Sequence, residues 1–225
     1  MSATRSISLR TEIPGPRSRE ILARETQAVA RALIVHAPVV AAEARGSTIT
    51  DVDGNTFIDF VGGVGVANVG HGHPRVVEAI QEQAERLIHT DFTVVAYEPY
   101  VELAERLGRL APIEGETRAA FFNAGTEAVE NAIKFARSYT GRPAVIGFEG
   151  GFHGRTLLSL TLTSKTHPYK AGLGPFAPEV YRVPFPNEYR GPNAAEALEA
   201  LERALVTQIA AETVAAIVLE PVQGE

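Results

Sequence analysis

The segment Asn-Ala-Gly-Thr-Glu at residues 123–127 is the first place where the residue types suggest chemistry. It lies between an apolar, β-prone run at 119–122 and a helical pattern at 127–137. A turn containing Gly125 and Thr126 just before a helix presents free backbone N–H groups and the positive end of the helix dipole, which suits a phosphate dianion. An ordinary helix cap gives the same pattern, so this segment does not identify a site by itself.

A second cluster, Glu-Gly-Gly-Phe-His-Gly-Arg-Thr, occupies residues 149–156 after a predicted strand at 144–148. Its glycines allow the backbone to approach a ligand closely. Phe152 offers a flat face to an aromatic ring, and Arg155 offers a planar fork to a carboxylate. The alternative is a glycine turn with a core phenylalanine and a surface arginine.

The third segment, Glu-Pro-Val-Gln-Gly-Glu at 220–225, follows an apolar run at 215–219 that we expect to be a strand buried on both faces. Ligands of open α/β sheets bind beyond the carboxyl ends of strands. The three segments are therefore predicted to open on one edge of a sheet. Their combination is much less probable by chance than any one of them.

Short apolar runs that alternate with helical patterns favour an α/β fold with a mostly parallel sheet. A hairpin is predicted from two β-prone runs, 48–52 and 56–60, on either side of Asp-Gly-Asn. Further helices are expected from residue 73 and over 98–110 and 194–209. Residues 1–24 are expected to be a loose arm, in which Gly15 and Pro16 would interrupt any helix.

Composition excludes several functional classes. The 225 residues carry a formal net charge of -6, which argues against nucleic acid as a partner. The chain contains no cysteine, so disulfides and cysteine-ligated zinc are excluded. A membrane span and a secretory signal are not expected, which leaves the cytoplasm as the predicted location. His71 and His73 lack further ligands nearby, so we predict no metal site.

These motifs together resemble successive signatures of class III, fold-type I aminotransferases, which use pyridoxal 5'-phosphate. The resemblance rests on residues 123–134, 151–156 and 220–225, and it extends to the hairpin, to Gly62-Gly63-Val64 and to residues 70–74. It implies that residues 1–72, an arm and a hairpin, contribute to a small domain. Residues 73–225 would then form the first part of the large cofactor-binding domain.

The resemblance also assigns the cofactor site. Gly125 and Thr126 match positions that donate hydrogen bonds to the cofactor phosphate. Phe152 would stack on the pyridine ring, and His153 belongs to the same site. In the family, a lysine holds the cofactor as a Schiff base and an aspartate pairs with the ring nitrogen. No residue here matches either of them, so we expect both to lie beyond Glu225. A chain of these 225 residues alone is therefore expected to be inactive.

Four positions are expected to contact the substrate. Arg155 matches the arginine that receives a carboxylate, and Glu220 would pair with it. Glu225 matches a glutamate that switches between substrates, and Val64 matches a position that lines the substrate channel.

Within this family, residues 168–170, 174–176, Tyr181 and 184–186 resemble the enzymes that act on 4-aminobutyrate more than those that act on acetylornithine or ornithine. The expected reaction of the intact enzyme gives succinate semialdehyde and then glutamate from 2-oxoglutarate. An acetylornithine, ornithine or other ω-amine aminotransferase is the nearest alternative. A non-catalytic fragment or subunit is the alternative from another class. The family also implies a homodimer or a dimer of dimers.

Overall fold

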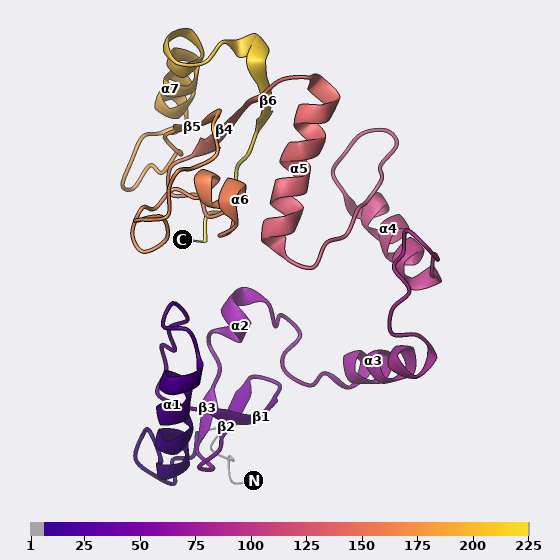
Figure 1. Ribbon diagram of the computed structural model, residues 1–225, viewed down its shortest axis with the longest axis vertical. Coiled ribbons are helices and arrows are strands. Elements are labelled where there is room, and N and C mark those ends of the chain that lie inside the picture. The colour runs from indigo at the N-terminus through magenta and orange to yellow at the C-terminus, as the bar shows by residue number, and fades with distance from the viewer. Residues whose placement is uncertain (1–6, 225) are drawn as a thin grey trace. The chain divides into compact units, whose positions relative to one another are not determined.

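The structure, a computed structural model, describes residues 7–224 as two compact units (Figure 1). The first unit contains the described residues up to Glu98, and the second begins at Pro99. The sequence analysis placed a domain boundary after residue 72. The assignment of these parts to the small and large domains of an aminotransferase remains a prediction.

The first unit is built on a small antiparallel sheet in the order β1-β2-β3. The predicted hairpin is confirmed, because Ile49 pairs with Phe57 and Thr50 with Thr56. Pattern reasoning missed β1, whose sequence Ala-Ala-Glu-Ala-Arg lacks β-branched residues. The elements of this unit are α1 (Pro16–Ala28), β1 (Ala41–Arg45), β2 (Thr48–Asp51), β3 (Thr56–Ile58), α2 (Gly62–Gly65) and α3 (Pro74–Arg86).

The helix α1 corrects the expectation of a loose arm over residues 1–24. Pro16 is the first helical residue, where a missing N–H costs nothing, so it starts the helix instead of interrupting one. The Asp53 carboxylate accepts hydrogen bonds from the backbone N–H groups of Arg17 and Ser18 at 2.7 and 2.8 Å. The turn of the hairpin thus caps a helix that is distant in sequence, and local pattern could not reveal this contact.

The second unit contains a parallel sheet in the order β5-β4-β6. The helix predicted at 98–110 is confirmed, and the helix predicted at 194–209 ends slightly earlier. The elements are α4 (Glu98–Leu110), α5 (Gly125–Thr140), β4 (Ala144–Phe148), α6 (Leu157–Leu162), β5 (Val180–Val183), α7 (Ala194–Thr207), a 3-10 turn η1 (Ala211–Thr213) and β6 (Val214–Ile217).

The central strand β4 divides the core of this unit into two clusters. Ala144 and Ile146 pack on one face with Ala204 of α7. Val145 packs on the other face with Ile133 of α5 and with a buried leucine of α6. Figure 1 shows α5 and α7 on opposite sides of the sheet. A strand that is buried on both faces fixes the point at which the chain emerges into the following loop.

Two strand predictions were wrong. Residues 119–122 form no strand, because no neighbouring strand within residues 7–224 offers them a hydrogen-bond ladder. The strand β6 exists but is not buried on both faces: Ile217 remains 47% exposed. Apolar composition indicates which residues favour a strand. Whether the strand pairs, and whether both of its faces are buried, depends on the strands and helices that lie next to it.

Within the described range 7–224, no helix combines the length and the apolar character needed to cross a membrane.

Asn55 ties the N-terminal arm to the hairpin of the first unit. Its side chain is fully buried. The oxygen Oδ1 accepts hydrogen bonds from the N–H groups of Arg10 and Thr11 at 2.7 and 3.0 Å. The nitrogen Nδ2 donates to Thr11 Oγ1 and to Asp51 Oδ2. All polar atoms of this amide are thus engaged, which makes it a specific anchor.

We predict that Asn55→Ala lowers the free energy of unfolding by about 2–3 kcal/mol, because it leaves buried partners without hydrogen bonds. Amide hydrogen exchange at Arg10 and Thr11 should accelerate accordingly. Asn68→Ala, at an exposed asparagine, serves as the matched control. Unchanged protection of both amides in Asn55→Ala would contradict the anchoring role.

Candidate functional site

The first turn of α5 has backbone N–H groups that no side chain caps. The preceding residue, Ala124, is extended and makes no side-chain cap. The first helical bond runs from the Ala128 N–H to the Ala124 carbonyl at 3.1 Å, so the N–H groups of the three residues between them have no helical acceptor. A Cβ added at Gly125 would meet no atom within 4 Å outside its neighbours and its own helix. Free N–H groups at a helix start suit an anion, and the predicted binding of a phosphate here stays a prediction.

The loop over residues 149–156 packs directly against this turn. Thr156 Oγ1 lies 2.7 Å from Thr126 Oγ1, and the Thr156 N–H points to the same oxygen at 3.4 Å. At Gly154, which has a φ of +124°, an added Cβ would overlap the Thr126 side chain and lie 2.7 Å from Ser159 Oγ. Only a glycine allows this approach. The structure thus brings the first two predicted motifs together.

The third predicted motif lies against the same loop. Glu220 Oε1 accepts a hydrogen bond from the Phe152 N–H at 2.7 Å. Gln223 Nε2 donates to the Glu149 carbonyl at 2.8 Å. Gly150 has a φ of +79°, a conformation that favours glycine, and an added Cβ would lie 2.6 Å from Gln223 Oε1. The three segments therefore meet as expected over their described residues, although the first of them follows no strand of the sheet.

The expected pair between Arg155 and Glu220 does not form among the residues that the structure describes. Glu220 instead accepts the backbone N–H of Phe152. The reason is local, because the loop turns the Phe152 N–H toward the carboxylate and leaves Arg155 exposed. Phe152 is half-buried, with its ring 5.1 Å from that of Tyr169 in an edge-on arrangement.

His153, within the loop, is buried, with only 8% of its surface exposed. Its N–H donates to Thr163 Oγ1 at 3.0 Å, while Nε2 has no hydrogen-bond partner. Burial lowers the pKa of His153, Glu220 opposes this shift and Arg182 adds to it. The burial of this ring thus favours its neutral form. The predicted contact between His153 and a cofactor stays a prediction.

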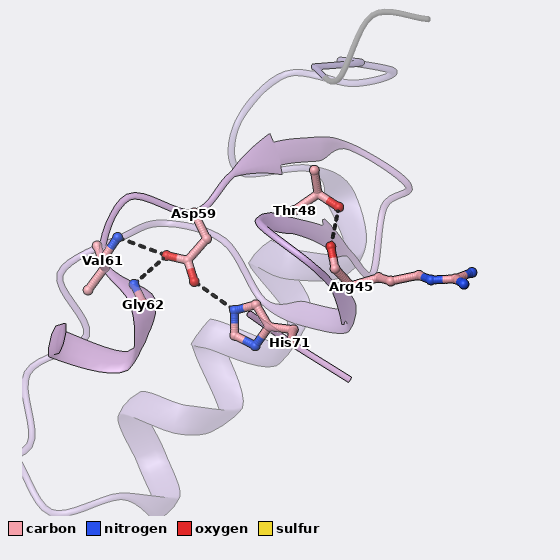
Figure 2. A network of polar contacts seen from close by, with 6 residues as sticks. All are labelled: Arg45, Thr48, Asp59, Val61, Gly62 and His71. Atoms are coloured by element: carbon pink, nitrogen blue, oxygen red, sulfur yellow. Dashed lines mark hydrogen bonds and ion pairs between the residues drawn. The ribbon is translucent and has the colours of Figure 1, made fainter. Parts of the chain in front are cut away.

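Val64 lies in the first unit, in a short turn with unusual backbone geometry. It is 84% exposed and has a φ of +62°, which is rare for a β-branched residue. Figure 2 shows how Asp59 holds the start of this turn: Oδ1 accepts the N–H groups of Val61 and Gly62, each at 2.9 Å. The predicted role of Val64 in a substrate channel is not tested by this geometry.

His71 completes the same network, with Nε2 2.7 Å from Asp59 Oδ2 (Figure 2). Hydrogen bonds from His71 and from the Gly62 N–H lower the pKa of the Asp59 carboxyl. His71 thus has a structural partner, and His73 precedes α3. Residues 7–224 contain no group of three or more histidine, aspartate or glutamate side chains placed to hold a metal ion. Glu225 lies outside the described residues.

The site also contains residues to which sequence reasoning gave no role. Glu130, Thr156 and Ser159 form a polar cluster behind Thr126. One signal was available, because Glu130 follows Thr126 by four positions and therefore shares its helix face. The contribution of Ser159 depends on the fold of the loop and carries no such signal.

Comparison with known proteins identifies the family to which these motifs belong. The family model described as "Aminotransferase class-III" matches residues 30–225. The chain belongs to the class III aminotransferases. It is 45% identical to a 4-aminobutyrate aminotransferase of Mycobacterium bovis in an alignment 236 residues long, which covers 100% of this chain and 52% of that protein. It is 50% identical over 193 residues to a probable 4-aminobutyrate aminotransferase of Bacillus subtilis, covering 83% of this chain and 44% of that protein.

Solved structures of transaminases share the fold. An (S)-enantioselective omega-transaminase from Thermomicrobium roseum aligns with a TM-score of 0.82 at 30% identity, covering 92% of this chain and 50% of that one. A taurine:2-oxoglutarate aminotransferase from Bifidobacterium kashiwanohense, in complex with pyridoxal phosphate and glutamate, also gives 0.82, at 28% identity and with 92% and 48% coverage. The α/β architecture with a parallel sheet is that of the fold-type I transferases. The chain spans about half the length of the curated relatives it matches.

Class III aminotransferases depend on pyridoxal phosphate, and the second unit fits this group. The uncapped first turn of α5 suits a phosphate, and the space beside Gly125 leaves room for it. Phe152 provides an aromatic face on the adjoining loop.

We predict that Gly154→Ala separates the loop from α5 and destabilises the protein by about 1–3 kcal/mol, because the methyl group would overlap Thr126. Gly172→Ala is the control: Gly172 also has a positive φ but is surrounded by open space. Thermal unfolding and amide exchange of residues 150–156 should show a loss in Gly154→Ala that clearly exceeds the loss in Gly172→Ala. Equal effects would mean that backbone strain, and not the contact with Thr126, explains the glycine.

Proposed function

We propose that this protein binds pyridoxal 5'-phosphate at the start of α5. In the full-length enzyme it would transfer the amino group of 4-aminobutyrate to 2-oxoglutarate, giving succinate semialdehyde and glutamate. The observation that carries the proposal is the close packing of the loop at Gly154 against Thr126, beside uncapped N–H groups. The identity of 45–50% to proteins named for 4-aminobutyrate supports the choice of amino donor.

Each residue of the site has a defined task in this proposal. The N–H of Gly125 and the N–H and hydroxyl of Thr126 bind the phosphate. Phe152 lies against one face of the pyridine ring. When bound, pyridoxal phosphate supplies a ring that accepts electrons from the substrate carbon as it loses a proton. His153 and Glu220 hold the loop in place from behind, through burial and through the Phe152 N–H.

Arg155 is proposed to receive a carboxylate of the substrate. It is exposed and forms no ion pair within residues 7–224, so its guanidinium is available for a ligand. Both 4-aminobutyrate and glutamate carry a carboxylate remote from the reacting amine, which a planar fork can bind through two hydrogen bonds.

The remaining parts of the proposal come from the family resemblance. Val64 would line the substrate channel, and Glu225 would adjust the site to donors with and without an α-carboxylate. Amino donor and 2-oxoglutarate are the small-molecule partners, and a second copy of the chain is the protein partner in a cytoplasmic homodimer or dimer of dimers.

The test is an amino-donor profile of the full-length protein with 2-oxoglutarate as acceptor. We expect the highest kcat/KM with 4-aminobutyrate, compared with 5-aminovalerate, ornithine and acetylornithine. Formation of succinate semialdehyde and glutamate is the readout. A clear preference for ornithine or acetylornithine would overturn the proposed donor while leaving the aminotransferase family intact.

We predict that Arg155→Lys lowers kcat/KM for 4-aminobutyrate by about tenfold to a hundredfold, because lysine keeps the charge but cannot form the bidentate fork. Arg203→Lys on the exposed face of α7 is the matched control and should leave the kinetics unchanged. A donor amine without a carboxylate should be affected much less by Arg155→Lys. An equal loss of kcat/KM for donors with and without a carboxylate would contradict the proposed contact between Arg155 and the substrate carboxylate.

A further inference from the structure

A cluster of hydroxyl groups lies directly behind Thr126, on the side of α6. Thr126 Oγ1 is 2.7 Å from Thr156 Oγ1 and 2.5 Å from Ser159 Oγ. The two hydroxyls of Thr156 and Ser159 are 3.0 Å apart. Ser159 is fully buried. Each hydroxyl has one proton to donate, so the direction of these hydrogen bonds is set by the group at the end of the cluster.

Glu130 is that group. Its Oε1 accepts a short hydrogen bond from the Thr156 hydroxyl and further bonds from the N–H groups of Leu158 and Ser159 at 3.1 and 3.3 Å. An ionised carboxylate can only accept. The single proton of Thr156 is therefore directed to Glu130, and Thr156 Oγ1 can only accept from its other neighbours.

Electrostatics agree with an ionised Glu130. Partial burial would raise the pKa of this carboxyl, but the hydrogen bonds from Thr156, Ser159 and Leu158 outweigh burial, and Lys134 adds a smaller effect. The net result is a pKa below the ordinary value of glutamate. Glu130 therefore acts as an acceptor throughout the neutral pH range.

The proton of Ser159 then has few acceptors. It is buried among Thr126 Oγ1, Thr156 Oγ1 and the Thr156 carbonyl, the last at 3.2 Å. When a phosphate oxygen accepts the proton of Thr126, the Thr126 oxygen can in turn accept the proton of Ser159. A hydroxyl that accepts one hydrogen bond donates the next more strongly. The cluster can thus hold Thr126 as a donor toward the phosphate.

We propose that Ser159 and Glu130 are positioning residues that orient the Thr126 hydroxyl toward the phosphate of the cofactor. The inference rests on the proposed function and extends it to residues that would not touch the cofactor. Neither residue is a catalytic residue, because each would act through Thr126. The competing explanation is structural: Glu130 accepts N–H groups at the start of α6 and could serve only as a cap of that helix.

The experiment compares binding of pyridoxal 5'-phosphate and of pyridoxal, which lacks the phosphate, to the cofactor-free full-length protein by fluorescence titration. Ser159→Ala should weaken binding of pyridoxal phosphate about tenfold, and it should change binding of pyridoxal by less than about twofold. Glu130→Gln, which keeps the shape of the side chain, should have an effect of the same kind. Ser138→Ala at the exposed end of α5 is the matched control and should alter neither affinity.

A double-mutant cycle separates the two explanations. Because Ser159 is proposed to act through Thr126, Ser159→Ala should add little to the loss already caused by Thr126→Val. Equal losses for pyridoxal phosphate and pyridoxal, or fully additive losses in the cycle, would overturn the inference and leave the cluster as a helix cap.

The wild-type protein provides the last distinction. A wild-type protein that binds pyridoxal phosphate no more tightly than pyridoxal would overturn the proposed function, and this inference with it. If the wild type binds pyridoxal phosphate more tightly than pyridoxal, but Ser159→Ala and Glu130→Gln leave both affinities unchanged, the inference is overturned and the proposed function stands. Circular dichroism of each variant confirms that the binding data refer to folded protein.

Discussion

The close approach of the backbone at Gly154 to the side chain of Thr126 is the contact on which the candidate site depends. A side chain at position 154 would occupy the space of the threonine, so the approach needs a residue without Cβ. It joins a helix start, which can bind an anion, to a loop that carries an aromatic ring and a guanidinium. Hydrogen bonds from Thr156 to Thr126 and to Glu130 join the loop and the helix beside this contact.

The sheet makes this approach possible. The loop over 149–156 leaves β4, whose first three residues are fully buried, so its starting point is held by the core. The segment after β6 emerges beside it, since β4 and β6 are parallel neighbours. Glu220 and Gln223 then bind the loop through its backbone groups. A rigid strand and a few specific hydrogen bonds thus position glycines that would otherwise be free to move.

Much of this arrangement was predictable from local sequence. The helices α3, α4 and α7 begin at residues that favour helix starts, and Asn193 forms a capping box with Glu196. The meeting of the second and third motifs followed from the rule that ligands bind at the carboxyl ends of parallel strands, since these motifs follow β4 and β6. These predictions succeeded because the signals lie within a few residues or within one topological rule.

The failures share a different cause. Pro16 starts α1 because Asp53, far along the chain, accepts the N–H groups of its first turn. Residues 119–122 have a β-prone composition but no strand to pair with in the part of the chain that the structure describes. Glu220 binds the Phe152 N–H instead of Arg155, because the loop conformation decides which donor is near. Contacts between distant residues determine these details, and pattern alone does not contain them.

The most direct test of the account is a crystal structure of the full-length protein with pyridoxal 5'-phosphate. The account predicts a phosphate within hydrogen-bond distance of the N–H groups of Gly125 and Thr126 and of the Thr126 hydroxyl, with the ring of Phe152 against the pyridine. A phosphate held elsewhere, with the first turn of α5 facing only solvent, would contradict it.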